Sequence, residues 1–158
     1  MSRRAGLAMN NCLGEQELVS GAPHSLRAGE RIASNMAPTV ARREDGSAAL
    51  AIGSPGSDRI PTALTQVLAL FANGGSDLLS AVAHPRVHVR VRPSQDPSVR
   101  VDHEEDLVLP GGLGLPERAM PSHSMYFGGV SAAMWTGGTG LEAYGDPRRT
   151  GVVAVQHG

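Results

Sequence analysis

The sequence predicts an α+β fold that covers residues 1–158 as a single domain, and its 158 residues are one domain's worth of chain. Three observations carry this prediction: a hairpin signal in the first third of the chain, an amphipathic helical stretch after it, and strand-like alternation further on. Strands and helices come in blocks rather than in strict alternation, which favours α+β over a doubly wound parallel sheet.

The first elements surround a hairpin signal. Residues 6–11 are expected to form a short strand that begins almost at the first residue, as though the domain started upstream, and residues 14–29 are expected to form a loop. The apolar-rich runs 38–43 and 47–53 flank an Asp-Gly pair that ends at Gly46. Glycine accepts the positive φ of a tight turn, so these two runs are predicted to form a β-hairpin.

Helical periodicity follows the hairpin. Apolar residues recur with helical spacing over residues 60–71, which predicts an amphipathic helix that Ser57 or Asp58 can cap. Gly74 follows the end of this helix. A second, short helix is expected to begin after a cap at Ser76.

The remaining elements are mostly strands. Residues 87–91 alternate valine with histidine and arginine, which predicts a half-exposed strand, and residues 98–103 are expected to form another. Residues 109–121 are rich in glycine and proline and are expected to be irregular. Residues 126–135 and 151–155 are predicted to be closing strands.

Composition and charge exclude several classes of protein. The 20 glycines and 11 prolines argue against a helical bundle, because each interior Gly or Pro costs a helix roughly 1–3 kcal/mol. All 14 basic residues are scattered arginines balanced by 15 acids, so no nucleic-acid partner is expected. The single cysteine, Cys12, leaves no internal disulfide and no multi-cysteine zinc site.

The apolar runs are short. None approaches the roughly 18 residues that cross a bilayer, and the run after Arg4 is too short for a signal-peptide core. We therefore expect no membrane partner, and expect the chain as written to stay in the compartment where it is made, the cytoplasm.

A loop of small residues, 53–57, precedes the predicted long helix and is the first candidate site. Small residues let backbone N–H groups approach a ligand, and the helix dipole adds partial positive charge. Such a loop can hold a phosphate, a carboxylate or the oxyanion of an acyl-transfer intermediate. Phosphate is the weaker choice, since the Lys-Ser/Thr ending of a P-loop is missing. The alternative is a plain strand-to-helix turn.

Two further places carry polar side chains that suit an amino-acid ligand. Ser34 and Asn35 stand just before a predicted strand, where they can bind a substrate carboxylate or simply form a capped loop. Glu15 follows the first predicted strand and can anchor a ligand ammonium or remain a solvated loop acid. His84 and His88 are four residues apart, but Pro85 between them argues against a helical metal site. We interpret them as surface or structural histidines, and expect no metal and no cofactor.

Seven short motifs occur in the order found in one enzyme family. They are Asn10-Asn11-Cys12-Leu13-Gly14-Glu15, Ser34-Asn35-Met36-Ala37-Pro38-Thr39, Gly53-Ser54-Pro55-Gly56-Ser57-Asp58-Arg59-Ile60, Gln66-Val67-Leu68, Ala83-His84-Pro85-Arg86-Val87-His88, Met125-Tyr126-Phe127-Gly128-Gly129-Val130 and Asp146-Pro147-Arg148-Arg149. Over nearly the whole chain this series resembles the C-terminal part of the small subunit of γ-glutamyltranspeptidases (γ-glutamyltransferase/glutathione hydrolase).

The resemblance implies part of an N-terminal-nucleophile hydrolase fold, a four-layer αββα sandwich, and transfer of a γ-glutamyl group to water or an amine. Gly56 and Ser57 match the pair whose backbone N–H groups form the oxyanion hole. Ser34 and Asn35 match the pair that holds the substrate α-carboxylate, and Glu15 falls where the family has an Asp for the α-ammonium. Ser57, Asn35 and Glu15 each depart from the family's Gly, Ser and Asp. If residue 57 needs a positive φ, serine is strained there.

The family's nucleophile, a Thr that begins the small subunit, has no match in the residues before Asn10. The resemblance therefore implies an enzyme fragment that supplies the oxyanion hole and substrate contacts for a γ-glutamyl compound such as glutathione. Its partner would be a missing N-terminal or large-subunit portion. The alternative is an inactive remnant or binding module for a glutamate-like amino acid. Alone, the chain would leave sheet edges and an apolar face open, so self-association is expected.

Overall fold

The structure is a computed structural model that describes residues 27–92, 96–111 and 113–156. Contacts divide the chain into two compact units, Met1–Asn35 and Met36–Gly158. The strand expected at residues 6–11 lies outside the described residues. In the first unit, residues 27–30 form a turn in which the Glu30 carboxylate accepts hydrogen bonds from the backbone and side chain of Arg27.

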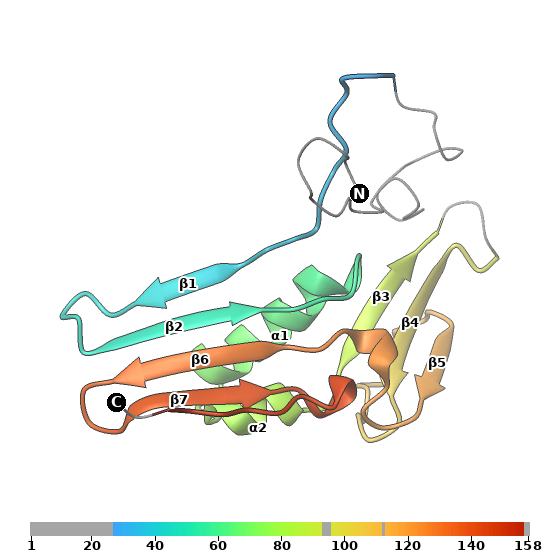
Figure 1. Ribbon diagram of the computed structural model, residues 1–158. Helices are drawn as coiled ribbons and strands as arrows, with labels where there is room; N and C mark the ends of the chain where they lie inside the picture. The colour runs from blue at the N-terminus through green and yellow to red at the C-terminus, as the bar shows by residue number, and fades with distance from the viewer. Residues whose placement is uncertain (1–26, 93–95, 112, 157–158) are drawn as a thin grey trace. The chain divides into compact units, whose positions relative to one another are not determined.

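A four-stranded antiparallel sheet runs through the second unit (Figure 1). Its order is β1-β2-β6-β7, with β1 at Thr39–Arg42, β2 at Ala48–Gly53, β6 at Ser131–Thr136 and β7 at Gly140–Gly145. The predicted hairpin is confirmed: β1 pairs with β2, and Gly46 in the connecting turn has a φ of +72°.

Two helices pack against one face of this sheet (Figure 1). Helix α1, Arg59–Ala72, confirms the predicted amphipathic helix, and its face of Ile60, Ala63, Leu64 and Val67 is buried. This face joins buried side chains of β2 and β6 in one apolar core. Helix α2, Leu78–Ala83, is capped by Asp77 rather than by Ser76, because the Asp77 carboxylate accepts the backbone N–H of Ser80.

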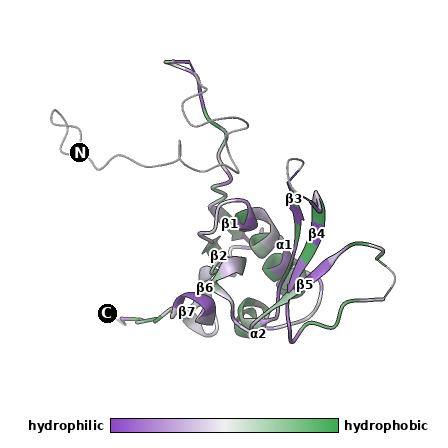
Figure 2. Ribbon diagram, turned by 90° about the vertical axis from the view of Figure 1, so that its right-hand side faces the viewer, coloured by the Kyte–Doolittle hydropathy of each residue, from purple (hydrophilic) through white to green (hydrophobic). Residues whose placement is uncertain are grey.

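A second, three-stranded sheet consists of β3, Val87–Val91, β4, Val99–Glu104, and β5, Glu117–Met120. Strand β5 corrects the expectation that residues 109–121 are irregular. It pairs in parallel with β4, and its short Glu-Arg-Ala-Met sequence carries little apolar signal. Figure 2 shows apolar residues (green) both on the helices and on strands of this sheet.

The alternation predicted for β3 is present, but the histidine and arginine side chains face inward. His88 and Arg90 are 6% and 7% exposed, whereas Val89 and Val91 are 51% and 54% exposed. A hydropathy pattern gives the period of a strand but not which face is covered when the covering surface is itself polar.

The C-terminal part differs from the sequence prediction in two places. Residues 126–135 are not one strand: a 3-10 turn, η2, Met125–Phe127, ends at Gly128, and β6 starts three residues later. Residues 151–155 form no strand. The chain instead closes the sheet with β7, which pairs with β6, and then forms a second 3-10 turn, η3, Pro147–Arg149. Within the described ranges, no helix combines the length and apolarity needed to cross a bilayer.

Candidate active site

The loop between β2 and α1 has an unusual backbone. Gly56 has a φ of +132°, and Ser57 has a φ of +55° although it carries a side chain. The condition under which a serine at residue 57 is strained, a positive φ, is therefore met. The carbonyls of Gly56 and Ser57 accept hydrogen bonds from the N–H groups of Arg59 and Ile60, at 3.1 and 3.2 Å, so the loop runs directly into the first turn of α1.

This loop packs backbone against backbone on Gly128. A Cβ added at Gly128 would lie 2.7 Å from the Pro55 carbonyl oxygen and 3.0 Å from Ser54 Oγ. A Cβ at Gly56 would lie 3.0 Å from Gly128 Cα. Ser54 Oγ donates to the Pro55 carbonyl at 2.8 Å and accepts the Gly129 N–H at 3.3 Å. Among the described residues, the half-buried Gly56 N–H has no acceptor.

Charged side chains surround the start of α1. Asp58 forms ion pairs with Arg59 and with Arg92, the latter at 2.7 Å, and makes no side-chain cap hydrogen bond to the helix. Arg59 donates from Nε to the Tyr126 carbonyl at 3.1 Å, and its guanidinium lies 4.7 Å from the centre of the Tyr126 ring. The exit of the loop is therefore tied to β3 and to η2.

His88 is a buried structural residue beside these charges. Its Nδ1 lies 3.0 Å from Thr62 Oγ1, and its Nε2 lies 3.9 Å from Asp58 Oδ2. Burial lowers the pKa of His88, although the charge of Asp58 acts in the opposite direction. His84 is exposed, with Nδ1 2.8 Å from its neighbour's carbonyl. In the described part of the chain, no three His, Cys, Asp or Glu side chains gather as metal ligands.

Tyr126 connects the loop to the three-stranded sheet. Its hydroxyl donates to Asp102 at 2.6 Å, and the same buried carboxylate binds Arg100 at 2.7 Å and Arg118 at 3.0 Å. Burial opposes ionisation of Asp102, but the hydrogen bonds from Arg100 and Tyr126 outweigh it, and the pKa of Asp102 is lowered. Burial and this hydrogen bond raise the pKa of Tyr126 to about 12.

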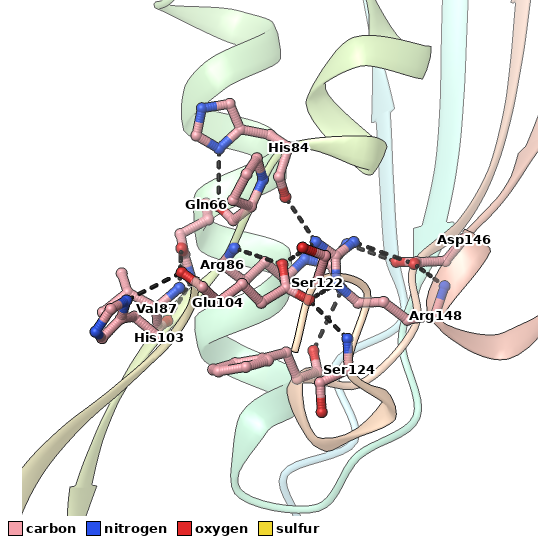
Figure 3. A network of polar contacts seen from close by, with 12 residues as sticks. Gln66, His84, Arg86, Val87, His103, Glu104, Ser122, Ser124, Asp146 and Arg148 are labelled. Carbon is pink, nitrogen blue, oxygen red and sulfur yellow. Dashed lines mark hydrogen bonds and ion pairs between the residues drawn. The ribbon is translucent and has the colours of Figure 1, made fainter. Parts of the chain in front are cut away.

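Figure 3 shows a buried network of ion pairs that joins Arg86, Glu104, Asp146 and Arg148. Arg86 binds Asp146 at 2.6 Å, and Arg148 binds both Asp146, at 3.2 Å, and Glu104. The carboxylates also accept backbone N–H groups: Asp146 from Val130 at 2.8 Å, and Glu104 from Arg86 at 2.9 Å. Motifs far apart in sequence therefore meet here, and they act as structure rather than as a binding site.

Ser34 and Asn35, which the sequence also predicts as site residues, belong to the first unit. Ser34 is exposed and Asn35 half-buried, both in coil at the end of the first unit. Glu15 lies outside the described residues. Of the predicted set, the structure thus brings Gly56 and Ser57 together on one loop. The roles predicted for Glu15, Ser34 and Asn35 remain predictions.

Sequence reasoning gave no individual role to Ser54, Tyr126 or Gly128, although all three stand in the quoted motifs. The signal that could have found Gly128 is the Gly-Gly pair that interrupts an apolar run at Phe127 and Val130. A pair of glycines inside such a run indicates close approach of another backbone.

Fold and loop together define an α+β domain. The turn before α1 holds the Gly56 N–H, which has no acceptor among the described residues. The gamma-glutamyltranspeptidase family matches residues 1–156. The chain belongs to this family. The chain is 30% identical over 142 residues to the glutathione hydrolase proenzyme of Pseudomonas aeruginosa, covering 87% of this chain and 24% of that protein. It is also 30% identical over 128 residues to the capsule biosynthesis protein CapD proenzyme of Bacillus anthracis, covering 81% and 23%.

Solved structures of transpeptidases are also similar to the chain. A highly active mutant of the gamma-glutamyltranspeptidase of Pseudomonas nitroreducens is similar with a TM-score of 0.69 and 26% identity, covering 91% of this chain and 73% of that chain. The Bacillus anthracis transpeptidase CapD is similar with a TM-score of 0.65 and 26% identity, covering 82% and 75%. The chain spans about a quarter of the length of the curated relatives.

Proposed function

We propose that this chain supplies the acyl-binding part of a γ-glutamyl transfer site. Gly56 and Ser57 offer backbone N–H groups to the oxyanion, while Ser34 and Asn35 hold the substrate α-carboxylate and Glu15 its α-ammonium. The donor is a γ-glutamyl compound such as glutathione, and the acceptor is water or an amine. Further polypeptide completes the αββα sandwich and brings the Thr nucleophile.

The backbone of residues 56–57 is the observation that carries this proposal. Ser57, with a φ of +55°, is followed by Asp58 in the right-handed helical region, and such a change of hand between neighbouring residues makes a concave turn of backbone N–H groups, the kind of geometry in which amides bind anions. The start of α1 adds partial positive charge at the same place. Holding a non-glycine residue in the left-handed region costs about 1–2 kcal/mol. The strain at Ser57 therefore fits a loop whose backbone N–H groups bind a ligand.

The chemistry follows from charge development. When a nucleophile attacks an acyl carbonyl, the oxygen gains negative charge, and donors fixed in advance stabilise that charge most. Removal of one such donor typically lowers kcat by about 10²–10³. The similarity to a glutathione hydrolase and to the transpeptidase CapD supports acyl transfer as the reaction class. The residues at 15 and 35 depart from the family pattern, so a related acyl group is also compatible.

One observation favours a second candidate function. Residues 15, 35 and 57 all depart from the family's Asp, Ser and Gly. A chain that works without the nucleophile would be a binding module for a glutamate-like amino acid, with measurable affinity and no turnover. The two candidates share the ligand and differ in chemistry.

Binding is tested first, by titrating the 158-residue chain calorimetrically with L-glutamate and with 2-amino-4-phosphonobutanoate, whose phosphonate mimics the tetrahedral oxyanion. Both ligands are expected to bind. Asn35→Asp should abolish binding of both, because it sets a second negative charge against the α-carboxylate. Asn73→Asp, the same change at an exposed helix end, should leave binding intact. Failure of the chain to bind either ligand would contradict the proposal.

Turnover separates the two candidates. Hydrolysis of γ-glutamyl-4-nitroanilide is measured for the chain alone and for a chimera in which it replaces the matching segment of the Pseudomonas aeruginosa proenzyme. The chain alone should be inactive and the chimera active. A folded, ligand-binding chimera without turnover would favour the binding module. Turnover by the chain alone would show that the nucleophile lies within these 158 residues.

A further inference from the structure

Gly128 contacts the same peptide unit that carries the Gly56 amide. Its missing Cβ leaves room for the Pro55 carbonyl oxygen, which an added Cβ would approach to 2.7 Å. The Pro55 carbonyl and the Gly56 N–H belong to one planar peptide group, so neither can turn without the other. The surface that supports the carbonyl therefore also sets the direction of the N–H.

The position of Gly128 is itself fixed by the buried ion network. On its N-terminal side, the Phe127 carbonyl accepts a hydrogen bond from Arg86 at 3.2 Å. Two residues after it, the Val130 N–H donates to Asp146 at 2.8 Å. Arg86 and Asp146 bind each other at 2.6 Å, and both side chains are almost fully buried. Gly128 is thus held between two backbone groups tied to a single ion pair.

Ser54 adds a second tie between the two segments. Its hydroxyl donates to the Pro55 carbonyl at 2.8 Å and accepts the Gly129 N–H at 3.3 Å. The carbonyl is therefore held by a hydrogen bond on one side and by Gly128 on the other.

We infer that Gly128 is a positioning residue, which sets the orientation of the oxyanion-binding Gly56 amide through the Pro55–Gly56 peptide group. The identity of the ligand rests on the proposed function. The mechanical coupling between Gly128 and the loop rests on the contacts alone. The two parts can therefore fail separately.

The first test compares Gly128→Ala with Gly46→Ala in the full 158-residue chain. Both glycines have a similar positive φ, +82° and +72°, but a Cβ at Gly46 has nothing within 4 Å. Both variants are therefore strained, and only Gly128→Ala displaces the Pro55 carbonyl. Hydrogen–deuterium exchange of the Arg59 and Ile60 amides, which bond to the loop, should accelerate roughly tenfold in Gly128→Ala and stay unchanged in Gly46→Ala.

The second readout is the ratio of the affinities for the two ligands, which a purely structural role of Gly128 would leave unchanged. An oriented amide contributes to the transition-state mimic more than to the ground-state ligand. Gly128→Ala should weaken binding of 2-amino-4-phosphonobutanoate about tenfold relative to L-glutamate, whose affinity should hold. Gly46→Ala should leave the ratio of the two affinities unchanged.

Each outcome decides something. The inference would be overturned if Gly128→Ala folds and both readouts match the wild type: the exchange rates of the Arg59 and Ile60 amides, and the ratio of the affinities for 2-amino-4-phosphonobutanoate and L-glutamate. If Gly128→Ala does not fold, Ser54→Ala takes its place, since it removes a tie without adding a clash. It should shift the exchange and the ratio in the same direction, Ser54→Thr should restore both, and no shift in either would overturn the inference. If the wild-type chain binds neither ligand, the proposed function fails and the exchange data alone decide on Gly128.

Discussion

The four-stranded sheet packs aliphatic side chains under α1 and α2, whereas the three-stranded sheet turns His88 and Arg90 inward and leaves valines in solvent. An aliphatic core is non-directional and tolerates swaps that conserve volume. A buried ion network depends on every partner, because a charge left alone in the interior is costly. The β2–α1 loop belongs to the first region and packs on Gly128, whose neighbours Phe127 and Val130 bond to the buried Arg86–Asp146 ion pair. Both kinds of packing therefore meet at the candidate site.

The largest effect is expected on the ionic side. Arg148→Met would leave Glu104 and Asp146 buried with one fewer cation and should lower the free energy of unfolding by about 3–5 kcal/mol. Arg149→Met, the same change at the exposed neighbour, should stay within about 0.5 kcal/mol. Urea denaturation followed by circular dichroism measures both. Equal stability of the two variants would contradict the structural role of the network.

The aliphatic side should respond to volume. Leu64→Ala, which opens a cavity in the core of α1, should cost about 2–4 kcal/mol, and Leu64→Met less than about 1.5 kcal/mol. Leu79→Ala on exposed α2 surface is the control. The contrast between the two regions is supported if Arg148→Lys, also a conservative change, lowers the free energy of unfolding much more than Leu64→Met does. Equal losses of unfolding free energy in these two variants would contradict it.

Tyr126→Phe should have an intermediate effect. It removes a hydroxyl donor from the buried Asp102 carboxylate, at an expected cost of about 1–2 kcal/mol. The raised pKa of Tyr126, about 12, implies stability that is fully present below pH 10 and is lost as the pH rises from 10 toward 12. Tyr126→Phe should flatten the stability profile in that window. A profile unchanged from wild type would show that the bond to Asp102 does not form.

The smallest effect is expected from His88. Burial lowers its pKa below the ordinary 6.5, so its contribution to stability is complete above pH 6.5 and is lost as the pH falls below it. NMR titration of the His88 ring should place its midpoint below 6.5. In urea denaturation between pH 7 and 5, His88→Gln should reduce the fall of the free energy of unfolding with falling pH. A His88 ring that titrates above 6.5 would mean that Asp58 outweighs burial.

Local signals predicted what local physics determines. The hairpin at Gly46 and the helix after Asp58 both follow from residues next to one another in sequence. Strand β5 pairs in parallel with β4 across a long connection, so no short window of sequence contains both strands. Strand β7 instead forms a hairpin with β6, in which Thr136 pairs with Gly140, and this local signal was missed. The reversed faces of β3 depend on polar neighbours such as Asp58 and Asp102, which hydropathy counts as surface.

The candidate site divides in the same way. Gly56 and Ser57 are recognisable because glycine and serine before a helix have a direct chemical meaning. Gly128 matters through the oxygen atom that approaches it from another segment. The Gly-Gly pair in the sequence indicates that some backbone comes close, but the structure is needed to show that it is the Pro55 carbonyl.

The late position of Asp146 and Arg148 in the sequence has a practical consequence. A polypeptide stopped at Gly145 would still contain every described strand and both helices. It would lack the acid that neutralises Arg86 and the guanidinium that neutralises Glu104. Translation must therefore pass the final strand before Arg86 and Glu104 acquire these partners, and a nascent chain that lacks η3 should keep both charges un-neutralised.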